Sequence, residues 1–249
     1  MVQAPSRRDR VRAATIEEIK QTARRLLVAE GPAAVSLRAI AREMGMTAPA
    51  LYRYFGSHED LIGHVIADIF TELADDITAA IDRAGDESGG DLTAKMVAAC
   101  REFRGWSLTH RPEFSLIFGS PLPALEAMQD SVCAACAMRF GSTFFALFME
   151  MWARHPFDVP ADSDIAPALR VQLQRYRDGL GVEMPLGAVL TFLRCWVRLY
   201  GMVSLEVFEH LHFALDDAAV MFEYTLSELA DLVGLQYRPP GGESQPALG

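Results

Sequence analysis

The chain has 249 residues, of which 51% are hydrophobic and 22% are charged. This composition supports a sizeable buried core and excludes a wholly disordered chain, while 18 glycines and 13 prolines are too few for a collagen-like or low-complexity protein. The formal net charge of −10 is unevenly distributed: residues 1–55 carry ten basic and five acidic side chains, whereas residues 56–249 carry 13 and 28. A small basic N-terminal segment therefore precedes a large acidic body.

The sequence predicts a cytoplasmic protein without a membrane span. Basic residues near the N-terminus are not followed by an apolar stretch, and the four cysteines form no extracellular framework. The least charged long stretch, residues 184–205, contains Arg194 and Arg198 near its middle. Each would cost about 2.5 to 3.5 kcal/mol at the centre of a bilayer, so we expect a buried helix instead.

Helical periodicity covers nearly the whole chain, and no alternating strand pattern of useful length is present. A capping box over residues 15–18 predicts the start of a first helix, which ends at Gly31. Two short helices are expected next, the first between the N-cap Ser36 and Gly45 and the second between Thr47 and Gly56. A second capping box, over residues 57–60, opens a long helix that continues to about residue 83.

Glycine and proline punctuate the remainder of the chain. A loop is expected at 85–90, and Pro112 is expected to end the helix that follows it. The later expected helices lie at about 92–110, 125–154, 164–178, 185–208 and 216–235, with an interruption at 120–123. We therefore predict an all-α protein with a basic arm (1–14), a three-helix helix-turn-helix domain (15–60), a larger helical effector-binding and dimerisation domain (61–235) and a disordered tail (236–249).

The two short helices have the length and turn chemistry of a helix-turn-helix, whose second helix enters the major groove of DNA. The same pattern also occurs in proteins that never bind DNA. Basic and aromatic residues around the motif favour a double-stranded DNA partner. They are Arg7, Arg8, Arg10 and Arg12 in the preceding arm, Arg38 on the first short helix, and Tyr52, Arg53 and Tyr54 on the second.

The run from Thr15 to Phe70, and above all the stretch 41–61, resembles the DNA-binding domain of tetracycline-repressor (TetR) family transcription regulators. The resemblance covers about the first quarter of the chain. It implies an all-helical remainder that binds a ligand and forms a dimer. It also implies a homodimer on a palindromic operator, usually acting as a repressor that a small molecule releases.

The resemblance implies a role for individual residues of the second short helix. Thr47 would cap this recognition helix and offer its hydroxyl or backbone N–H to a phosphate, and Tyr52 would donate its phenol to the DNA backbone. Three small apolar residues would face the groove and suit thymine methyl groups, and these are Ala48, Pro49 and Ala50. Much of any guanine reading would then fall to Arg38 or Arg53, and a solvated arginine without a base contact is the alternative for each.

His58 departs from the family pattern, which usually has Lys or Arg at this position. A neutral imidazole would weaken the phosphate contact and a protonated one would restore it, so pH-dependent operator affinity is a hypothesis. The complete expected DNA-binding set is Arg10, Arg12, Ser36, Arg38, Thr47, Ala48, Pro49, Ala50, Tyr52, Arg53, Tyr54 and His58.

Methionine and aromatic residues recur through the middle helices, and together they predict a pocket for a small apolar effector between helices. For any single residue, ordinary core packing is the alternative. The expected lining residues are Met96, Phe103, Trp106, Phe114, Phe118, Phe144, Phe148, Met151, Trp152, Tyr176, Phe192 and Trp196. Candidate polar anchors are Arg101, Arg104, Arg194 and Arg198, although surface arginines are the alternative for these.

The last two long expected helices are the natural dimer pair, because in TetR-family proteins such helices form a four-helix bundle between protomers. Gly201 would permit their close approach, and an intramolecular core is the alternative for these helices. Cys133 and Cys136 form a CxxC without a second CxxC or a neighbouring histidine pair, so we expect no metal. No catalytic constellation or cofactor motif is present, so we expect no enzyme. The alternative function is a helical lipophile-binding or protein-interaction module whose helix-turn-helix is vestigial.

Overall fold

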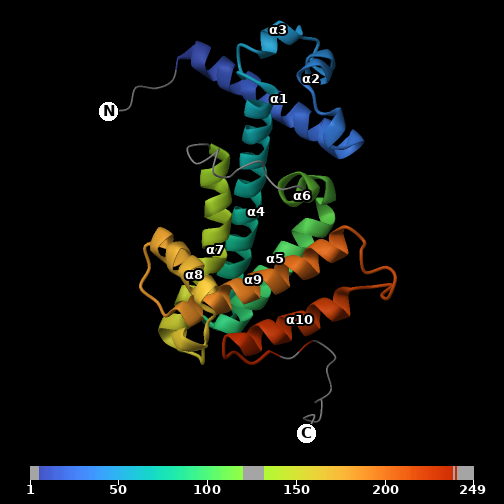
Figure 1. Ribbon diagram of the computed structural model, residues 1–249. Helices are drawn as coiled ribbons and strands as arrows, with labels where there is room; N and C mark the ends of the chain where they lie inside the picture. Colours follow the sequence, from blue (N-terminus) through green and yellow to red (C-terminus); the bar gives the residue numbers. More distant parts are fainter. Residues whose placement is uncertain (1–5, 120–131, 238, 240–249) are drawn as a thin grey trace. The chain divides into compact units, whose positions relative to one another are not determined.

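The computed structural model describes residues 6–119, 132–237 and 239, and all its regular elements in these ranges are helices (Figure 1). The expected all-α fold is confirmed. The chain divides into two compact units, of which the first comprises residues 1–75 and 109–141 and the second residues 76–108 and 142–249. Two long helices, α4 (His58–Ser88) and α7 (Val132–Arg154), contribute residues to both units. The functional division expected at residues 60 and 61 stays a prediction.

The first unit begins with α1 (Arg7–Glu30), followed by a short 3-10 turn, α2 (Leu37–Glu43), α3 (Ala48–Leu51) and the first part of α4. It also contains α6 (Arg111–Phe118) and the first turns of α7. These helices surround a common apolar core, because each of the first four contributes side chains that solvent barely reaches. The largest of them are Ile19, Leu27, Ile40, Leu51, Phe55, Leu61 and Ile69.

Helix α1 begins eight residues before the capping box expected at Thr15, and that expectation is wrong. Ser6 is the N-cap: its hydroxyl accepts from the N–H of Asp9 at 3.2 Å, and its own N–H donates to the Asp9 carboxylate at 3.2 Å. This reciprocal pair satisfies two of the free N–H groups at a helix start. Thr15 lies inside the helix, where its hydroxyl donates to the Val11 carbonyl at 3.0 Å.

Other helix boundaries differ from the expected ones for local reasons. Helix α4 continues to Ser88, through the start of the loop expected at 85–90, and ends where Gly89 and Gly90 adopt positive φ angles of 68° and 88°. Pro112 lies in the first turn of α6, where a missing N–H has no cost. The interruption expected at 120–123 and the first residues of the helix expected at 125–154 lie outside the described residues.

The second unit contains α5 (Leu92–Thr109), the last turns of α7, α8 (Pro167–Leu180), α9 (Leu186–Val207) and α10 (Ala219–Leu232). Helix α10 runs beside α9, and α8 also packs against α9 (Figure 1). A Cβ atom on Gly187 would lie 2.0 Å from the Pro160 carbonyl oxygen, so only glycine allows α9 to begin this close to the segment between α7 and α8. The buried core of this unit includes Phe103, Val189, Val203, Phe222 and Leu226.

Ion pairs join the helices of the second unit. Arg104 of α5 donates to Glu206 of α9 at 2.7 Å, and its guanidinium lies 5.0 Å from the ring centroid of Phe222 on α10. Arg101 donates to Glu223 of α10 at 3.0 Å and to the Tyr237 hydroxyl at 2.6 Å. Burial and the hydrogen bond with Glu223 raise the pKa of Tyr237 to about 12. Tyr237 falls within the tail expected to be disordered, yet it has these defined contacts.

Helices α7 and α9 are long and apolar enough to cross a membrane by length and composition alone. Half of the most apolar window of α9 is buried inside the structure, against neighbours that include α8 and α10. Core helices of soluble proteins meet the same criterion. These two helices are therefore weak grounds for a membrane span.

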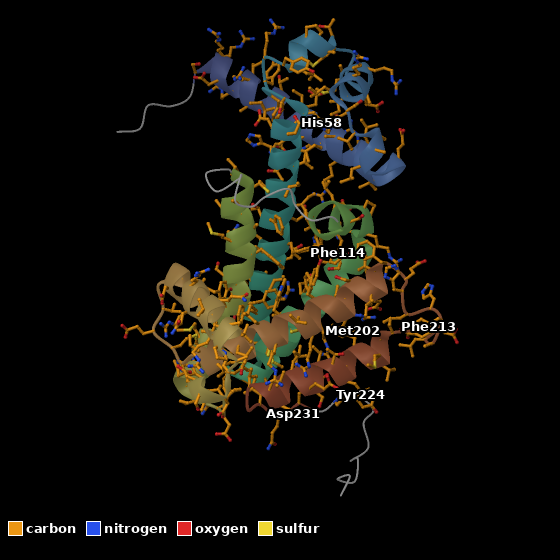
Figure 2. The ribbon with its side chains drawn as sticks, viewed as in Figure 1. His58, Phe114, Met202, Phe213, Tyr224 and Asp231 are labelled. Carbon is orange, nitrogen blue, oxygen red and sulfur yellow. The ribbon has the colours of Figure 1, made fainter. Side chains whose placement is uncertain are left out.

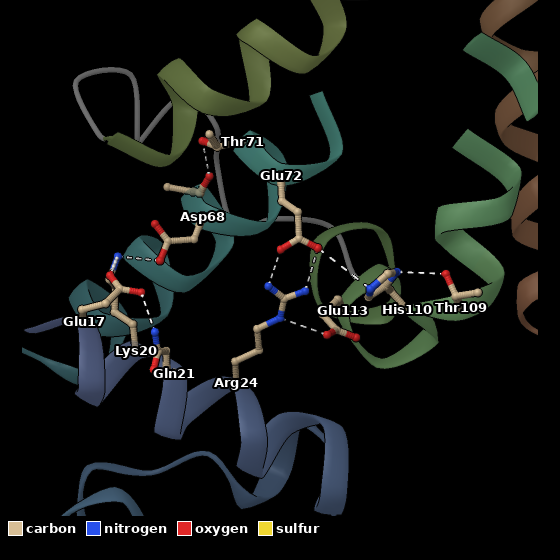
Figure 3. Close-up of polar contacts among 11 residues, drawn as sticks. Glu17, Lys20, Gln21, Arg24, Asp68, Thr71, Glu72, Thr109, His110 and Glu113 are labelled. Carbon is tan, nitrogen blue, oxygen red and sulfur yellow. Dashed lines mark hydrogen bonds and ion pairs between the residues drawn. The ribbon is translucent and has the colours of Figure 1, made fainter. Parts of the chain in front are cut away.

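Arg24 of α1 connects three helices of the first unit (Figure 3). Its guanidinium donates to Glu72 of α4 at 3.0 Å and to Glu113 of α6 at 3.0 Å. The hydrogen bond with Glu72, followed by that with Glu113, raises the pKa of Arg24 despite partial burial. One turn earlier, Lys20 bonds to Asp68 of α4 at 2.6 Å. These contacts fix α1 against α4 and α6 through charge as well as through apolar packing.

We expect Arg24→Met to lower the free energy of unfolding by about 3 kcal/mol, because it leaves the Glu113 side chain, which is only 5% exposed, without its cation. The neighbouring Arg25 is exposed, and Arg25→Met should cost less than about 1 kcal/mol. Urea unfolding followed by circular dichroism measures both values. Equal losses for the two variants would contradict a structural role of the Arg24 contacts.

Candidate nucleic-acid interface and ligand cavity

Helices α2 and α3 are joined by a tight turn that depends on one glycine. Gly45 has a φ of +64°, a left-handed conformation that favours residues without a Cβ atom. The N–H of Met46 then reaches back to the Ala41 carbonyl at 2.8 Å and closes the end of α2. At its other end, α2 is capped by the Ser36 hydroxyl, which accepts from the Ala39 N–H at 3.2 Å. The sequence therefore fixes both ends of α2 and the direction in which α3 leaves it.

Helix α3 is a single turn of four residues, shorter than the helix expected between Thr47 and Gly56. The Leu51 carbonyl accepts from the N–H groups of both Tyr54, at 2.8 Å, and Phe55, at 3.1 Å. The bond from Tyr54 spans only three residues, which tightens the helix into a turn. Leu51 and Phe55 are almost fully buried, so this segment is held mainly by their packing.

The side of α3 opposite Leu51 is open to solvent in the first unit. Thr47, Pro49 and Arg53 are exposed, and 56% of the Tyr52 surface is accessible. The two alanines between them, Ala48 and Ala50, are partly buried. Thr47 is the N-cap of α3, but its hydroxyl makes no capping hydrogen bond. The exposed side thus presents polar groups that α3 does not use for its own stability.

Three arginines of the expected DNA-binding set lie on α1 and α2 of the same unit. Arg10 on α1 and Arg38 on α2 are exposed. Arg12 is also exposed, but it donates to the Arg53 carbonyl at 3.1 Å and its guanidinium lies 5.1 Å from the centroid of the Tyr54 ring. The structure therefore places Arg12 against the end of α3, a contact that the sequence does not reveal.

His58 begins α4 in the first unit (Figure 2). Its Nε2 lies 2.7 Å from the Val35 carbonyl oxygen, which can only accept, so Nε2 is the donor. This contact connects the start of α4 to the residue before the N-cap of α2 and leaves only Nδ1 for any bond to DNA. Ser57, which precedes it, accepts from the Asp60 N–H at 3.1 Å, as its predicted capping role requires.

The second unit contains an apolar cavity of about 50 Å³ between α5, α7, α9 and α10. Six of the expected lining residues surround it. The six are Met96, Phe144, Phe148, Met151, Phe192 and Trp196. No charged side chain lines the cavity, and three of the candidate anchors form ion pairs elsewhere: Arg101 with Glu223, Arg104 with Glu206 and Arg198 with Glu228.

The other expected lining residues lie away from this cavity. In the second unit, Phe103 is buried behind Phe144 and Trp196, Trp106 is buried, Trp152 packs on Phe157, and Tyr176 is 39% exposed on α8. Phe114 and Phe118 belong to the first unit, where they form an aromatic cluster with Phe70 and Phe140. Helical periodicity predicts which side chains are buried, but it does not predict which other buried side chains they contact.

Seven residues of the cavity wall were not predicted from the sequence, and two of them carry thiols: Cys100 of α5 and Cys195 of α9. Burial raises the pKa of Cys100 to about 12 and that of Cys195 to about 11. Both thiols therefore stay protonated near neutral pH and act as small, polarisable apolar groups. Only their positions at helical spacing with Met96 and Phe192 could have suggested this role.

Comparison with known proteins identifies the family. Residues 19–65 match the bacterial regulatory proteins of the tetR family, and residues 96–229, more than half of the chain, match the tetracyclin repressor-like C-terminal domain. The HTH-type transcriptional regulators Rv1816 of Mycobacterium tuberculosis and Mb1846 of Mycobacterium bovis are each 31% identical over 209 residues, which are 83% of this chain and 86% of each relative.

Solved structures agree with this assignment. SCO4313, described as a regulatory protein, is 30% identical with a TM-score of 0.69, over 91% of this chain and all of the other. A structure described as a tetR family transcription regulator from Shewanella sp. PV-4 shares the fold, at 19% identity and a TM-score of 0.53, over 88% of this chain and 95% of the other. The family consists of DNA-binding regulators and not of enzymes. The resemblance seen in the sequence is confirmed, and the chain belongs to the tetR family of transcription regulators.

Proposed function

We propose that the protein is a homodimeric repressor that binds a palindromic operator through α3 and is released by a small apolar effector. The observation that carries the proposal is the open side of α3, which presents Thr47, Pro49 and Tyr52 to solvent while Leu51 anchors the helix from behind. A polar, solvent-facing helix side within a well-packed three-helix frame is suited to enter a major groove.

In this proposal the exposed groups divide into two kinds of contact. The hydroxyls of Thr47 and Tyr52 and the guanidinium of Arg10 bind phosphates and set the register on DNA. Base edges are read by Arg38 and Arg53, and thymine methyl groups meet the small residues of α3, namely Ala48, Pro49 and Ala50. Ser36 and His58 contribute through the ends of α2 and α4, and Tyr54 supports the end of α3.

Homodimerisation would follow from the exposed sides of α9 and α10. On α9, Val197 is 68% exposed and Leu205 is 42% exposed, with Gly201 between them. On α10, Tyr224 and Asp231 lie along one side (Figure 2), and Val220 is 65% exposed. Two copies of this surface can bury each other around a two-fold axis and present two reading helices to half-sites about 34 to 36 Å apart.

The effector would occupy the cavity of the second unit. Its wall holds aromatic rings, thioethers and protonated thiols but no charge, so an uncharged apolar compound fits its chemistry. A cavity of about 50 Å³ is smaller than most organic ligands, so side chains must move when one enters. A ligand that binds the expanded arrangement better than the compact one shifts the population between them, which is the only way in which it can change DNA affinity.

Replacing individual groups on the open side of α3 should separate the two kinds of DNA contact. On a duplex selected from a random library by the wild-type protein, Tyr52→Phe should weaken binding about tenfold on all sequences, through the loss of a backbone hydrogen bond. Arg38→Ala should lose about 1 to 3 kcal/mol at one base pair and relax specificity there. Fluorescence anisotropy measures both effects. Arg154→Ala, on α7, is the charge-matched control, and losses of the same size for it would contradict the assignment.

The dimer surface can be tested with glycines that have open space around them. Gly201→Arg should convert the protein into a monomer with unchanged helical content, because no atom lies within 4 Å of a Cβ atom there and the charge would meet its own copy across the axis. Gly179→Arg on α8 also meets nothing within 4 Å and should leave the dimer intact. Sedimentation velocity distinguishes these outcomes. A Gly201→Arg variant that stays dimeric would place the interface elsewhere.

The cavity predicts a preference for uncharged ligands. Naphthalene should raise the thermal midpoint of the wild-type protein, whereas naphthoate should not, because its carboxylate would be buried without a partner. Ala99→Leu fills part of the cavity and should abolish the naphthalene shift. Ala98→Leu, one residue away and outside the lining, should keep it. Differential scanning fluorimetry provides the readout, and a shift that survives Ala99→Leu would exclude this cavity as the binding site.

A further inference from the structure

Several arginines of α1 and α2 are expected to bind DNA. Among the described residues, Arg12 is the only one of them with a hydrogen bond or ring contact to the residues that follow α3. It lies in the second turn of α1, which is helical here because the Ser6 capping box starts the helix at Arg7. Its Nη2 donates to the Arg53 carbonyl at 3.1 Å, and the guanidinium carbon lies 5.1 Å from the centre of the Tyr54 ring. One side chain thus contacts both the backbone and a ring at the end of α3.

Helix α3 requires such support. It has four residues, and a single helical turn in isolation is unstable because too few hydrogen bonds form for the backbone that is fixed. Leu51 and Phe55 hold the inner side by packing. Residues 52–54, from which Tyr52 and Arg53 project outward, are tied to α3 by backbone bonds, of which the one from the Arg53 N–H to the Ala50 carbonyl is the longest, at 3.3 Å.

We infer that Arg12 is a positioning residue for DNA reading: it fixes the backbone after α3 and thereby orients Tyr52 and Arg53, and it does not itself bind a phosphate. The inference rests on the proposed function insofar as α3 enters the groove. A planar guanidinium can donate in its plane to the Arg53 carbonyl while its face lies over the Tyr54 ring. An ammonium group is a point charge that cannot reproduce both contacts from one position.

Arg10 provides the contrast. It is also exposed on α1, two residues earlier, and carries the same charge. If Arg10 binds a phosphate, its removal releases fewer counterions on binding, and the slope of log K against log salt falls by about 0.9 for each protomer. The loss should be similar on every sequence, and lysine at this position should restore it. A positioning residue has the opposite signature, since the salt slope is kept and specificity is lost.

The test compares Arg12→Ala, Arg12→Lys, Arg10→Ala and Arg10→Lys with the wild-type dimer on two duplexes across a series of salt concentrations. One duplex is selected by the wild-type protein from a random library, and the other is a scramble of the same composition. For Arg12→Ala we expect affinity for the selected duplex to fall roughly three- to tenfold, an unchanged salt slope, and unchanged affinity for the scramble. Arg12→Lys should show the same loss, whereas Arg10→Lys should behave like the wild-type protein.

A salt slope reduced by Arg12→Ala, or full recovery with Arg12→Lys, would overturn the inference and make Arg12 a phosphate ligand. Equal losses on both duplexes would overturn it as well. Thermal unfolding of each variant shows whether the first unit stays folded, and because Arg12 is exposed we expect a change in midpoint of no more than a few degrees. If the wild-type protein selects no duplex at all, the proposed operator binding fails, and this result is distinct from every outcome of the Arg12 comparison.

Discussion

The arrangement of helices in the first unit depends on one guanidinium shared between two carboxylates. Arg24 joins α1 to Glu72 on α4 and to Glu113 on α6, and the Glu113 carboxylate is almost inaccessible to solvent. A charge buried to this extent is tolerated only with its partner, so the three helices are constrained to one mutual geometry. The positions of α2 and α3 depend on this geometry as well, because the chain enters them from α1 and leaves them into α4.

Much of the fold could be predicted from the sequence, because apolar periodicity and capping chemistry act over a few residues. The N-cap Ser36 and the glycine turn at Gly45 have the predicted roles. The start of α1 could not be placed correctly, since two capping boxes compete and only the outer one, at Ser6, is used. The shortness of α3 was also not predictable, because the bonds from Tyr54 and Phe55 to the Leu51 carbonyl, which accompany its end, leave no mark in the sequence pattern.

The candidate site was predictable to the extent that it is local. Residues 47–54, which form α3 and its two ends, follow one another in the sequence, so the motif alone indicated them. Contacts between distant residues were not predictable: the positions of Arg12 and Arg53 are 41 residues apart, and no periodicity relates them. The cavity shows the same limit, because Phe114 and Phe192 both read as inward-facing aromatic residues and yet belong to different compact units.

The wall of the cavity has a consequence for any compound that it admits. With no ionised group and only weakly polar sulfur atoms and one indole N–H among the lining side chains, the orientation of a bound compound depends mainly on its shape. Each methylene added or removed changes its transfer free energy by about 0.8 kcal/mol, so neighbouring hydrocarbons differ in occupancy only by small factors. If this cavity is the effector site, as we propose, the protein would respond to a chemical class and not to a single metabolite.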